Sequence, residues 1–193
     1  MAGRILRADI VDAAVSILDR GGLPALAMRR IAAELDVQQS ALYWHFANKQ
    51  ELLAALADRI LEATAAPTAS DWPDRIAELA IALRATLLEH KDGADLVATA
   101  YAFGLGADAA VQPFLDELTA AGLAAADAAT AASVLLHFVL GYTTGEQQHH
   151  QATALHALDS GRMPHGRDPF GPEDFQRGVQ LIVRGIRPPQ RSS

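Results

Sequence analysis

The stretch from Gln38 to Lys49, QQSALYWHFANK, carries the chain's densest set of side chains able to recognise another molecule. Amides, a hydroxyl, an imidazole and an ammonium group alternate there with the rings of Tyr43, Trp44 and Phe46. A buried core segment rarely carries so many polar groups, and an ordinary solvated surface rarely carries three aromatic rings. Hydrogen-bonding groups interleaved with rings suit a helix that packs by one side and contacts nucleic acid by the other.

Apolar residues at helical spacing predict helices on both sides of this stretch. A helix, a tight turn and a second helix with exposed polar residues form the geometry that places the second helix in a major groove. Asn48 is expected to cap the helix that follows, which has a broad apolar stripe. The predicted elements are a helix over residues 6–17 ended by Gly21-Gly22, a helix over 28–35, a turn at Asp36-Val37, a helix over 38–45 and a helix from Asn48 to Ile60.

The net charge of −7 argues against a DNA-binding protein until it is divided along the chain. Residues 1–60 hold seven Lys and Arg against seven Asp and Glu, whereas residues 61–193 hold nine against sixteen. Phosphate contact requires local positive charge rather than a basic protein, and Arg29, Arg30 and Lys49 lie in one short segment. A solvated surface with no partner is the alternative interpretation, and charge by itself favours it.

The rest of the chain predicts more helices and no strand, so the expected fold is all-α. Residues 134–140 are apolar on every side, which indicates a helix covered by its own core and by a second chain. Gly178 and Gly185 would let another helix approach the last one closely. The expected segments are a linker over residues 67–73, helices over 76–90, 95–101, 111–121 and 124–150, a flexible loop over 152–172, a last helix over 175–186 and a disordered tail over 188–193.

The motifs LYWHF at residues 42–46 and NKQELL at residues 48–53, with IAAEL at residues 31–35, resemble the N-terminal domain of TetR-family (tetracycline-repressor-like) regulators. The resemblance covers roughly residues 5–63. It implies a helix-turn-helix DNA-binding domain over residues 1–65, with the motif at about 28–47, and a regulatory domain over 66–193.

In that family, the matching positions contact the bases and phosphates of an operator. The resemblance implies base contacts by Arg29 and Gln39, and base or thymine-methyl contacts by Ser40 and Ala41. It implies phosphate contacts by Tyr43, His45 and Lys49. Arginine suits guanine and glutamine suits adenine, which agrees with these roles.

Other residues of the motif have structural roles or depart from the family. We assign Leu42, Trp44 and Phe46 to packing. Ala27 and Met28 stand where the family has a capping Thr or Ser, and loss of a cap costs about 1 kcal/mol. Asp36 stands where the family has a turn glycine, although aspartate adopts the left-handed conformation less readily.

The C-terminal half resembles the tetracycline-repressor subgroup through LLEHKDGA at residues 87–94, HFVLG at 137–141, QQH at 147–149 and LIVRG at 181–185. This implies a homodimer joined by a four-helix bundle of the long eighth helix and the last helix, with a ligand cavity in each subunit. The positions that hold the magnesium–drug chelate in that subgroup are here Leu79, Leu83, Val97, Ala100 and Gly145.

Hard cations need oxygen or imidazole ligands, so these residues predict no magnesium–tetracycline site. Glu146 lies one residue from the family's glutamate position and could replace one ligand at most. We expect a mostly apolar effector pocket, although its residues could equally be ordinary core. The pocket candidates are Leu79, Leu83, Val97, Tyr101, His137 and Tyr142, with Thr143 as another possible polar group.

Enzymatic chemistry is not expected, since the chain has no cysteine, paired-carboxylate motif, glycine-rich phosphate loop or His-x-x-x-His spacing. No cofactor or metal is expected, and His149-His150 is interpreted as a solvated pair. The longest apolar run, Ala131 to Tyr142, is interrupted by Ser133 and His137 and is shorter than the roughly 20 residues that span a bilayer, so we expect a cytoplasmic protein.

The predicted function is a ligand-responsive repressor with a palindromic operator and an unidentified small effector. Two alternatives stay open: a constitutive DNA-binding regulator without an effector, and an enzyme or carrier with a DNA-binding tether.

Overall fold

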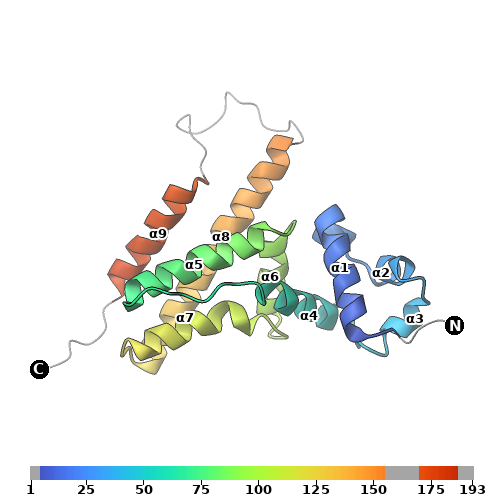
Figure 1. Ribbon diagram of the computed structural model, residues 1–193, viewed down its shortest axis with the longest axis horizontal. Coiled ribbons are helices and arrows are strands. Elements are labelled where there is room, and N and C mark those ends of the chain that lie inside the picture. The colour runs from blue at the N-terminus through green and yellow to red at the C-terminus, as the bar shows by residue number, and fades with distance from the viewer. Residues whose placement is uncertain (1–4, 155–169, 187–193) are drawn as a thin grey trace, which may run out of the picture. The chain divides into compact units, whose positions relative to one another are not determined.

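The computed structural model describes residues 5–154 and 170–186, and within these ranges it contains helices and no strand. The all-α prediction is therefore confirmed. The helices are α1 (Arg7–Gly21), the short 3₁₀ helix η1 (Leu23–Ala25), α2 (Met28–Glu34), α3 (Gln39–Leu42), α4 (Lys49–Leu61), α5 (Trp72–Leu88), α6 (Gly93–Ala102), α7 (Asp108–Ala120), α8 (Ala125–Ala154) and α9 (Pro172–Gly185) (Figure 1).

The chain forms two compact units. The first unit contains residues 1–63 and 86–109, and the second contains residues 64–85 and 110–193. In the first unit α1 packs against α2 and α4, and α4 packs against α6. Their buried residues recur at helical spacing, as at Ile10, Ala14 and Ile17 of α1. Segment 86–109, which the sequence assigned to the regulatory half, thus packs with the N-terminal helices.

Helix α3 is held by two fully buried side chains, Leu42 and Phe46. The predicted helix over residues 38–45 is shorter in the structure, because α3 ends at Leu42 and a turn follows. The backbone N–H groups of His45 and Phe46 both donate to the Leu42 carbonyl, each at 3.0 Å. The packing predicted for Leu42 and Phe46 is confirmed.

The packing role predicted for Trp44 is wrong. Its side chain is 89% exposed, whereas Leu42 and Phe46 are 0% exposed. Residues four apart in a helical turn share a face, so Leu42 and Phe46 point to the core together and the residue between them points away. Trp44 therefore adds an apolar surface to the same segment as the polar groups.

The turns around α3 follow the sequence prediction. Asp36 adopts the left-handed conformation with φ of 51°. The Asn48 side chain accepts a hydrogen bond of 2.9 Å from the Glu51 backbone and so caps α4, as predicted. The Glu51 carboxylate in turn accepts one of 2.9 Å from the Ala47 backbone. At the start of α2 Ala27 provides no side-chain cap.

Helix α6 is fastened to the first unit at both ends. Before it, Asp92 has a left-handed backbone (φ 57°), and its carboxylate accepts a hydrogen bond of 2.9 Å from the Leu23 backbone. The neighbouring His90 ring nitrogen lies 2.9 Å from an Asp19 carboxylate oxygen. After α6, the Asp58 carboxylate accepts a 2.8 Å hydrogen bond from the Ala107 backbone. These contacts join α6 to the end of α1, to η1 and to α4.

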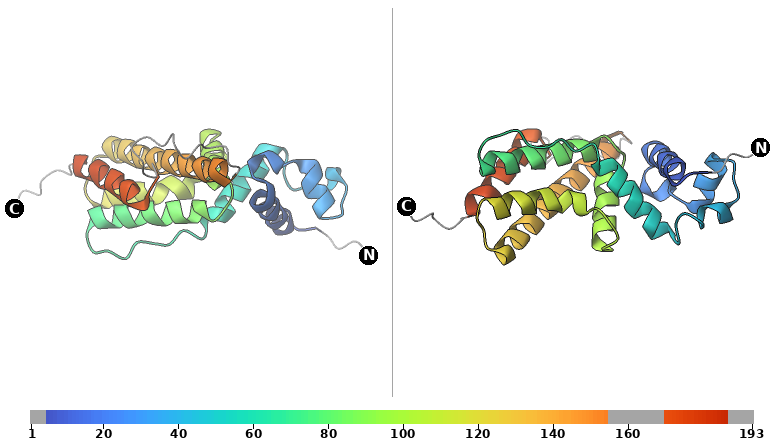
Figure 2. Two further views of the ribbon diagram at one scale, coloured as in Figure 1. Left: turned by 90° about the horizontal axis from the view of Figure 1, so that it is seen from above. Right: turned by 60° about the horizontal axis from the view of Figure 1, so that its bottom comes forward.

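The second unit is built from α5, α7, α8 and α9, and α8 and α9 lie side by side (Figure 2). By length and composition alone α8 could cross a bilayer, but part of it is buried in this unit and supplies its core. A side chain at Gly178 would collide with the Phe138 ring, so Gly178 permits a close approach, as predicted. Gly185 has no neighbour of this kind within the described residues.

Two predicted segments lie partly outside the described residues. Of the loop expected over residues 152–172, Ala152–Ala154 belong to α8 and Pro172 begins α9, while residues 155–169 are not described. The tail expected over residues 188–193 also lies outside the described part of the chain.

Two ion pairs tie helices of the second unit together. Arg75 of α5 donates to the Glu117 carboxylate of α7 through Nε at 2.7 Å. Arg84 of α5 donates to the buried Glu146 carboxylate of α8 through Nε at 2.8 Å, and its guanidinium lies 5.3 Å from the Phe175 ring centroid. The Arg84–Glu146 pair therefore connects α5, α8 and α9.

We predict that acid weakens the second unit through Glu117. The hydrogen bonds from Arg75, followed by the attraction of its charge, lower the pKa of Glu117. A carboxylate with a lowered folded-state pKa stabilises the fold above its unfolded pKa, and this contribution disappears as pH falls through the folded pKa. Glu117→Gln should lower the melting temperature at pH 7, and the difference from the wild type should shrink below pH of about 4.

The exposed Glu89 provides the matched control, Glu89→Gln. The melting temperature of Glu89→Gln should differ little from that of the wild type, both at pH 7 and below pH of about 4. A Glu117→Gln difference that stays constant from pH 7 to pH 3 would contradict the assignment.

We also predict opposite outcomes for two neighbours in the α3 segment. Leu42→Ala should destabilise the protein by about 2–5 kcal/mol, because it leaves a cavity in the core. Trp44→Ala should change stability by about 0.5 kcal/mol or less, because the ring has few contacts to lose. Chemical denaturation of both variants tests this, and a large loss for Trp44→Ala would restore its packing role.

Candidate nucleic-acid interface

The seven residues predicted to contact DNA lie on adjoining segments of the first unit, and none of them is buried. Helix α2 carries the first, α3 carries three, the turn after α3 carries two, and α4 begins with the last. Five are exposed and two, Ala41 and His45, are partly exposed. In chain order they are Arg29, Gln39, Ser40, Ala41, Tyr43, His45 and Lys49.

Gln39 and Tyr43 are joined directly. The Gln39 amide donates a hydrogen bond of 3.2 Å to the Tyr43 hydroxyl oxygen, as residues four apart on one face can. The amide is thereby oriented before any ligand binds, and the Tyr43 hydroxyl hydrogen stays available as a donor. The pair can present an acceptor and a donor to a neighbouring molecule.

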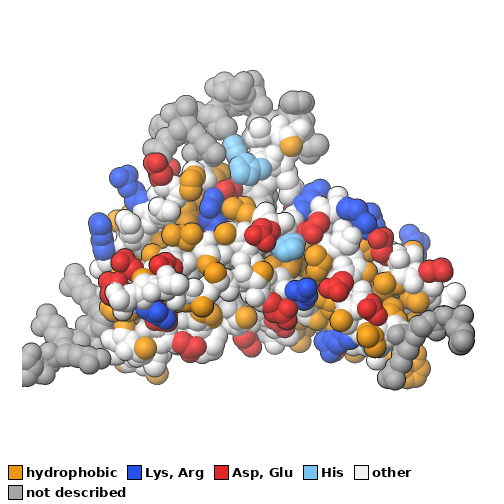
Figure 3. Space-filling view, in the orientation of Figure 1, with side chains coloured by type: hydrophobic (Ala, Val, Ile, Leu, Met, Phe, Trp, Pro, Cys, Tyr) orange, Lys and Arg blue, Asp and Glu red, His pale blue; other side chains and the backbone are white. Residues whose placement is uncertain are grey.

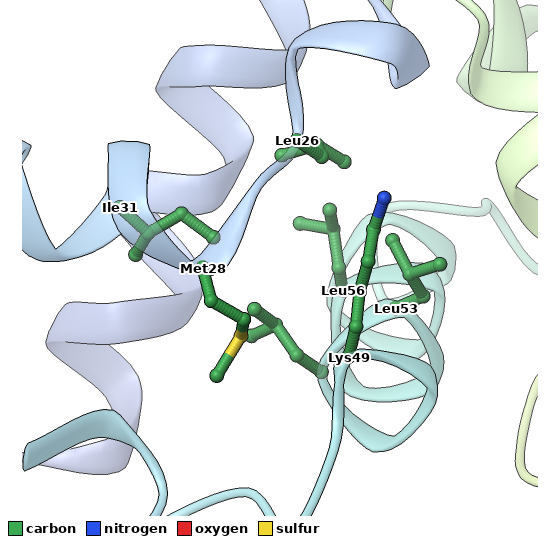
Figure 4. Close-up of a pocket in the computed structure, with 7 residues that line it drawn as sticks. Leu26, Met28, Ile31, Lys49, Leu53 and Leu56 are labelled. Carbon is green, nitrogen blue, oxygen red and sulfur yellow. The ribbon is translucent and has the colours of Figure 1, made fainter. Parts of the chain in front are cut away.

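Lys49 combines an apolar stem with an exposed charge. It lines an apolar pocket between α2 and α4 together with Leu26, Met28, Ile31, Leu52, Leu53 and Leu56. In Figure 4 its stem runs alongside Leu53 and Leu56, with the nitrogen at the far end. The stem packs while the ammonium group stays in water, which is usual for lysine. The charge is therefore held near the start of α4.

Arg29, Arg30 and Lys49 differ from other cations of the first unit in their partners. Arg20 lies 2.8 Å from a Glu34 oxygen, and Arg59 lies 3.6 Å from an Asp12 oxygen. For Arg29, Arg30 and Lys49 the described residues provide no carboxylate within 4.0 Å. Elsewhere acidic and basic side chains are interspersed, as on the face in Figure 3. The helix-turn-helix thus keeps positive charge that its own fold does not neutralise.

The candidate effector residues are divided between the two units. Val97 is buried and Tyr101 partly buried in the first unit, while Leu79 and Leu83 are buried in the second. The effector pocket predicted from these four residues, together with His137 and Tyr142, therefore stays a prediction.

The polar candidates on α8 have partners of their own. The Tyr142 hydroxyl donates to the Gly171 carbonyl at 2.8 Å, and its ring contacts Phe138, Phe170 and Phe175. His137 is exposed, and its Nδ1 lies 2.7 Å from the Ser133 carbonyl oxygen.

The Arg84–Glu146 pair was not anticipated from the sequence. Its signal was an arginine in the otherwise apolar run AIALRA of α5. Because the Glu146 carboxylate is occupied by Arg84, it is not available as an uncommitted oxygen ligand in this arrangement. Within the described ranges, no three His, Cys, Asp or Glu side chains cluster as metal ligands do.

The His149 and His150 rings are 6.3 Å apart, and His149 lies 5.8 Å from the Phe170 ring. Their interpretation as residues without a metal stays a prediction.

Both parts of the chain are similar to known proteins. Residues 10–56 match the family described as "Bacterial regulatory proteins, tetR family", and residues 64–164 match "Tetracyclin repressor-like, C-terminal domain". The Tetracycline repressor protein class D of Escherichia coli is 30% identical over 200 residues, which cover 95% of this chain and 89% of that protein.

Solved structures of regulators are also similar to this chain. Mycobacterium smegmatis BioQ is 43% identical with a TM-score of 0.84, covering 94% of this chain and 97% of that one. BioQ with its double-stranded DNA operator is 39% identical with a TM-score of 0.76 and the same coverage. ActR of Streptomyces coelicolor in complex with (S)-DNPA is 28% identical with a TM-score of 0.73, covering 95% and 97%. Since the family matches extend over most of the chain, the protein belongs to the TetR family of DNA-binding transcriptional regulators.

Proposed function

We propose that this regulator is a repressor that binds a palindromic operator as a homodimer and leaves it when a small, mostly apolar effector binds. As a TetR-family member it is a transcription factor and not an enzyme. The observation that carries the proposal is the exposed set on α2, α3 and α4, whose positive charges have no carboxylate partner among the described residues. The DNA-bound BioQ structure supports the use of this fold on an operator.

In this proposal α3 enters the major groove. Arg29 and Gln39 contact base edges, with Ser40 and Ala41 close to bases or thymine methyl groups. Tyr43, His45 and Lys49 hold phosphates on either side of the groove. We assign this reading function to residues 1–65 and effector binding and dimerisation to residues 66–193, and we place the protein in the cytoplasm, where it meets its operator.

Homodimerisation is supported by α8 and α9. Val134 of α8 is 49% exposed and Leu181 of α9 is 62% exposed, although both are large apolar residues. A second copy would cover them in a four-helix bundle. A two-fold dimer presents its recognition helices about 34 Å apart, which matches the symmetry of a palindromic site.

The effector is proposed to differ from magnesium–tetracycline. Leu79, Leu83 and Val97 supply apolar side chains where a chelate needs oxygen or imidazole groups. Glu146, which lies one residue from the family's glutamate position in the sequence, is hydrogen-bonded to Arg84. No cofactor is part of the proposal.

Operator binding tests the reading residues. On an operator fragment taken from the DNA flanking the protein's own coding region, Arg29→Ala and Gln39→Ala should each weaken binding by roughly 1–3 kcal/mol and relax selectivity at one base position. Gln50→Ala, an exposed glutamine of α4 without an assigned contact, is the control and should bind normally. Unchanged affinity for both Arg29→Ala and Gln39→Ala would refute the assignment.

Ligand screening tests the effector class. In a thermal-shift screen of apolar and aromatic compounds, at least one compound should stabilise the protein and also release the operator. A ligand at 100 times its Kd stabilises the folded state by about 2.7 kcal/mol, which such a screen resolves. Magnesium with tetracycline should do neither. Release by magnesium–tetracycline would contradict the proposal, and the absence of any releasing compound would favour the constitutive regulator.

A further inference from the structure

Arg7, in the first turn of α1, has a fixed position against the DNA-reading segment. Its guanidinium carbon lies 4.5 Å from the centroid of the Phe46 ring. Phe46 is fully buried and directly follows His45 in the turn between α3 and α4. The start of α1 therefore lies beside this turn (Figure 1). A side chain of α1, far from this turn in the sequence, thus contacts the segment that carries Tyr43 and His45.

The contact with the Phe46 ring leaves guanidinium N–H donors of Arg7 available for a ligand. An arginine beside an aromatic ring is attracted by the ring's electrons and needs no conventional hydrogen bond for this contact. Its five N–H donors lie in the plane of the guanidinium and point outward, where they match two oxygens of a phosphate. The side chain is exposed, so solvent or a ligand can reach it. The ring contact also restricts the rotamers of a long side chain, so less freedom is lost when it binds.

The carboxylates near Arg7 have other partners. In an open cleft of about 510 Å³ along α1 and α4, Arg7 and Arg59 occur with three acidic residues. Asp12 and Glu62 lie 3.6 Å and 3.3 Å from Arg59 nitrogens. Asp58 accepts the hydrogen bond from the Ala107 backbone. These three carboxylates therefore have partners other than Arg7.

Asp9, the acidic residue of the first turn, has a partner too. It accepts a hydrogen bond of 2.8 Å from the Leu6 backbone, so its carboxylate is engaged at the start of α1. As for Arg29 and Lys49, the part of the chain that is described places no carboxylate within 4.0 Å of Arg7.

We propose that Arg7 binds an operator phosphate and that Phe46 orients it for this contact. The proposal rests on the proposed function, because it extends the phosphate-binding set of Tyr43, His45 and Lys49 to α1. The alternative role is structural, with Arg7 only covering the Phe46 ring. The two roles differ in their effect on the salt slope, which is the magnitude of the fall in log affinity with log salt concentration, because each phosphate neutralised by a cation adds about 0.9 to that magnitude.

The experiment titrates the full-length protein onto the flanking operator fragment at several salt concentrations. Arg7→Met keeps an apolar chain over Phe46 and removes the charge, so it should lower the salt slope by about one while the melting temperature stays close to wild type. Arg7→Lys should keep the slope but weaken binding, because an ammonium lacks the planar fork. Arg20→Ala is the control for an arginine already paired with a carboxylate and should leave the slope unchanged.

The role of Phe46 is tested by a double-mutant cycle. Phe46→Leu keeps an apolar core residue and removes the ring, so Arg7→Met should cost less binding in that background than in wild type. Equal costs in both backgrounds would overturn the orienting role.

The Lys49→Ala variant distinguishes a failure of the Arg7 proposal from a failure of the proposed function. If it lowers the slope while Arg7→Met does not, the Arg7 proposal fails and the proposed function stands. If the wild type shows no preference for the operator over unrelated DNA, the proposed function itself fails. A lower melting temperature with an unchanged slope for Arg7→Met would identify a structural role and overturn the proposal.

Discussion

The burial of Leu42 and Phe46 is the interaction on which the DNA-reading surface depends. A helix of four residues such as α3 has too few internal hydrogen bonds to form by itself. Each of these two side chains contributes about 1.5–3 kcal/mol when removed from water, and together they fix which face of the segment points outward. Gln39 and Tyr43 can be oriented by one hydrogen bond because the backbone beneath them is held.

The fastening of α6 gives the proposed regulation a physical route. Asp92 bonds to the Leu23 backbone before α6, and Asp58 bonds to the Ala107 backbone after it. A shift of α6 would therefore be passed to η1 and α4, the elements that flank the helix-turn-helix. Couplings of about 1–3 kcal/mol are typical of allosteric proteins, and in the proposed function such a coupling releases the operator.

Local sequence patterns predicted the helices, but they did not predict contacts between residues that lie far apart in the sequence. Helical spacing identified the buried faces, and the Asn48 cap and the Asp36 turn follow from chemistry within a few residues. Trp44 differs from the prediction because its position between the buried Leu42 and Phe46 turns it to the outer face, although its ring is apolar. The Arg84–Glu146 pair joins residues 62 apart, and the packing of segment 86–109 with the N-terminal helices is equally non-local. Periodicity shows which face is buried, but not which helix covers it.

In the proposed function, an acidic chain keeps a small set of cations without carboxylate partners on its helix-turn-helix in order to bind a two-fold operator. Hydroxyl-radical footprinting on the DNA flanking the protein's own coding region tests this most directly. We expect two protected half-sites related by a palindrome, with centres one helical turn or a multiple of it apart, about 10–10.5 base pairs per turn. A single protected half-site, or protection without sequence preference at physiological salt, would contradict it.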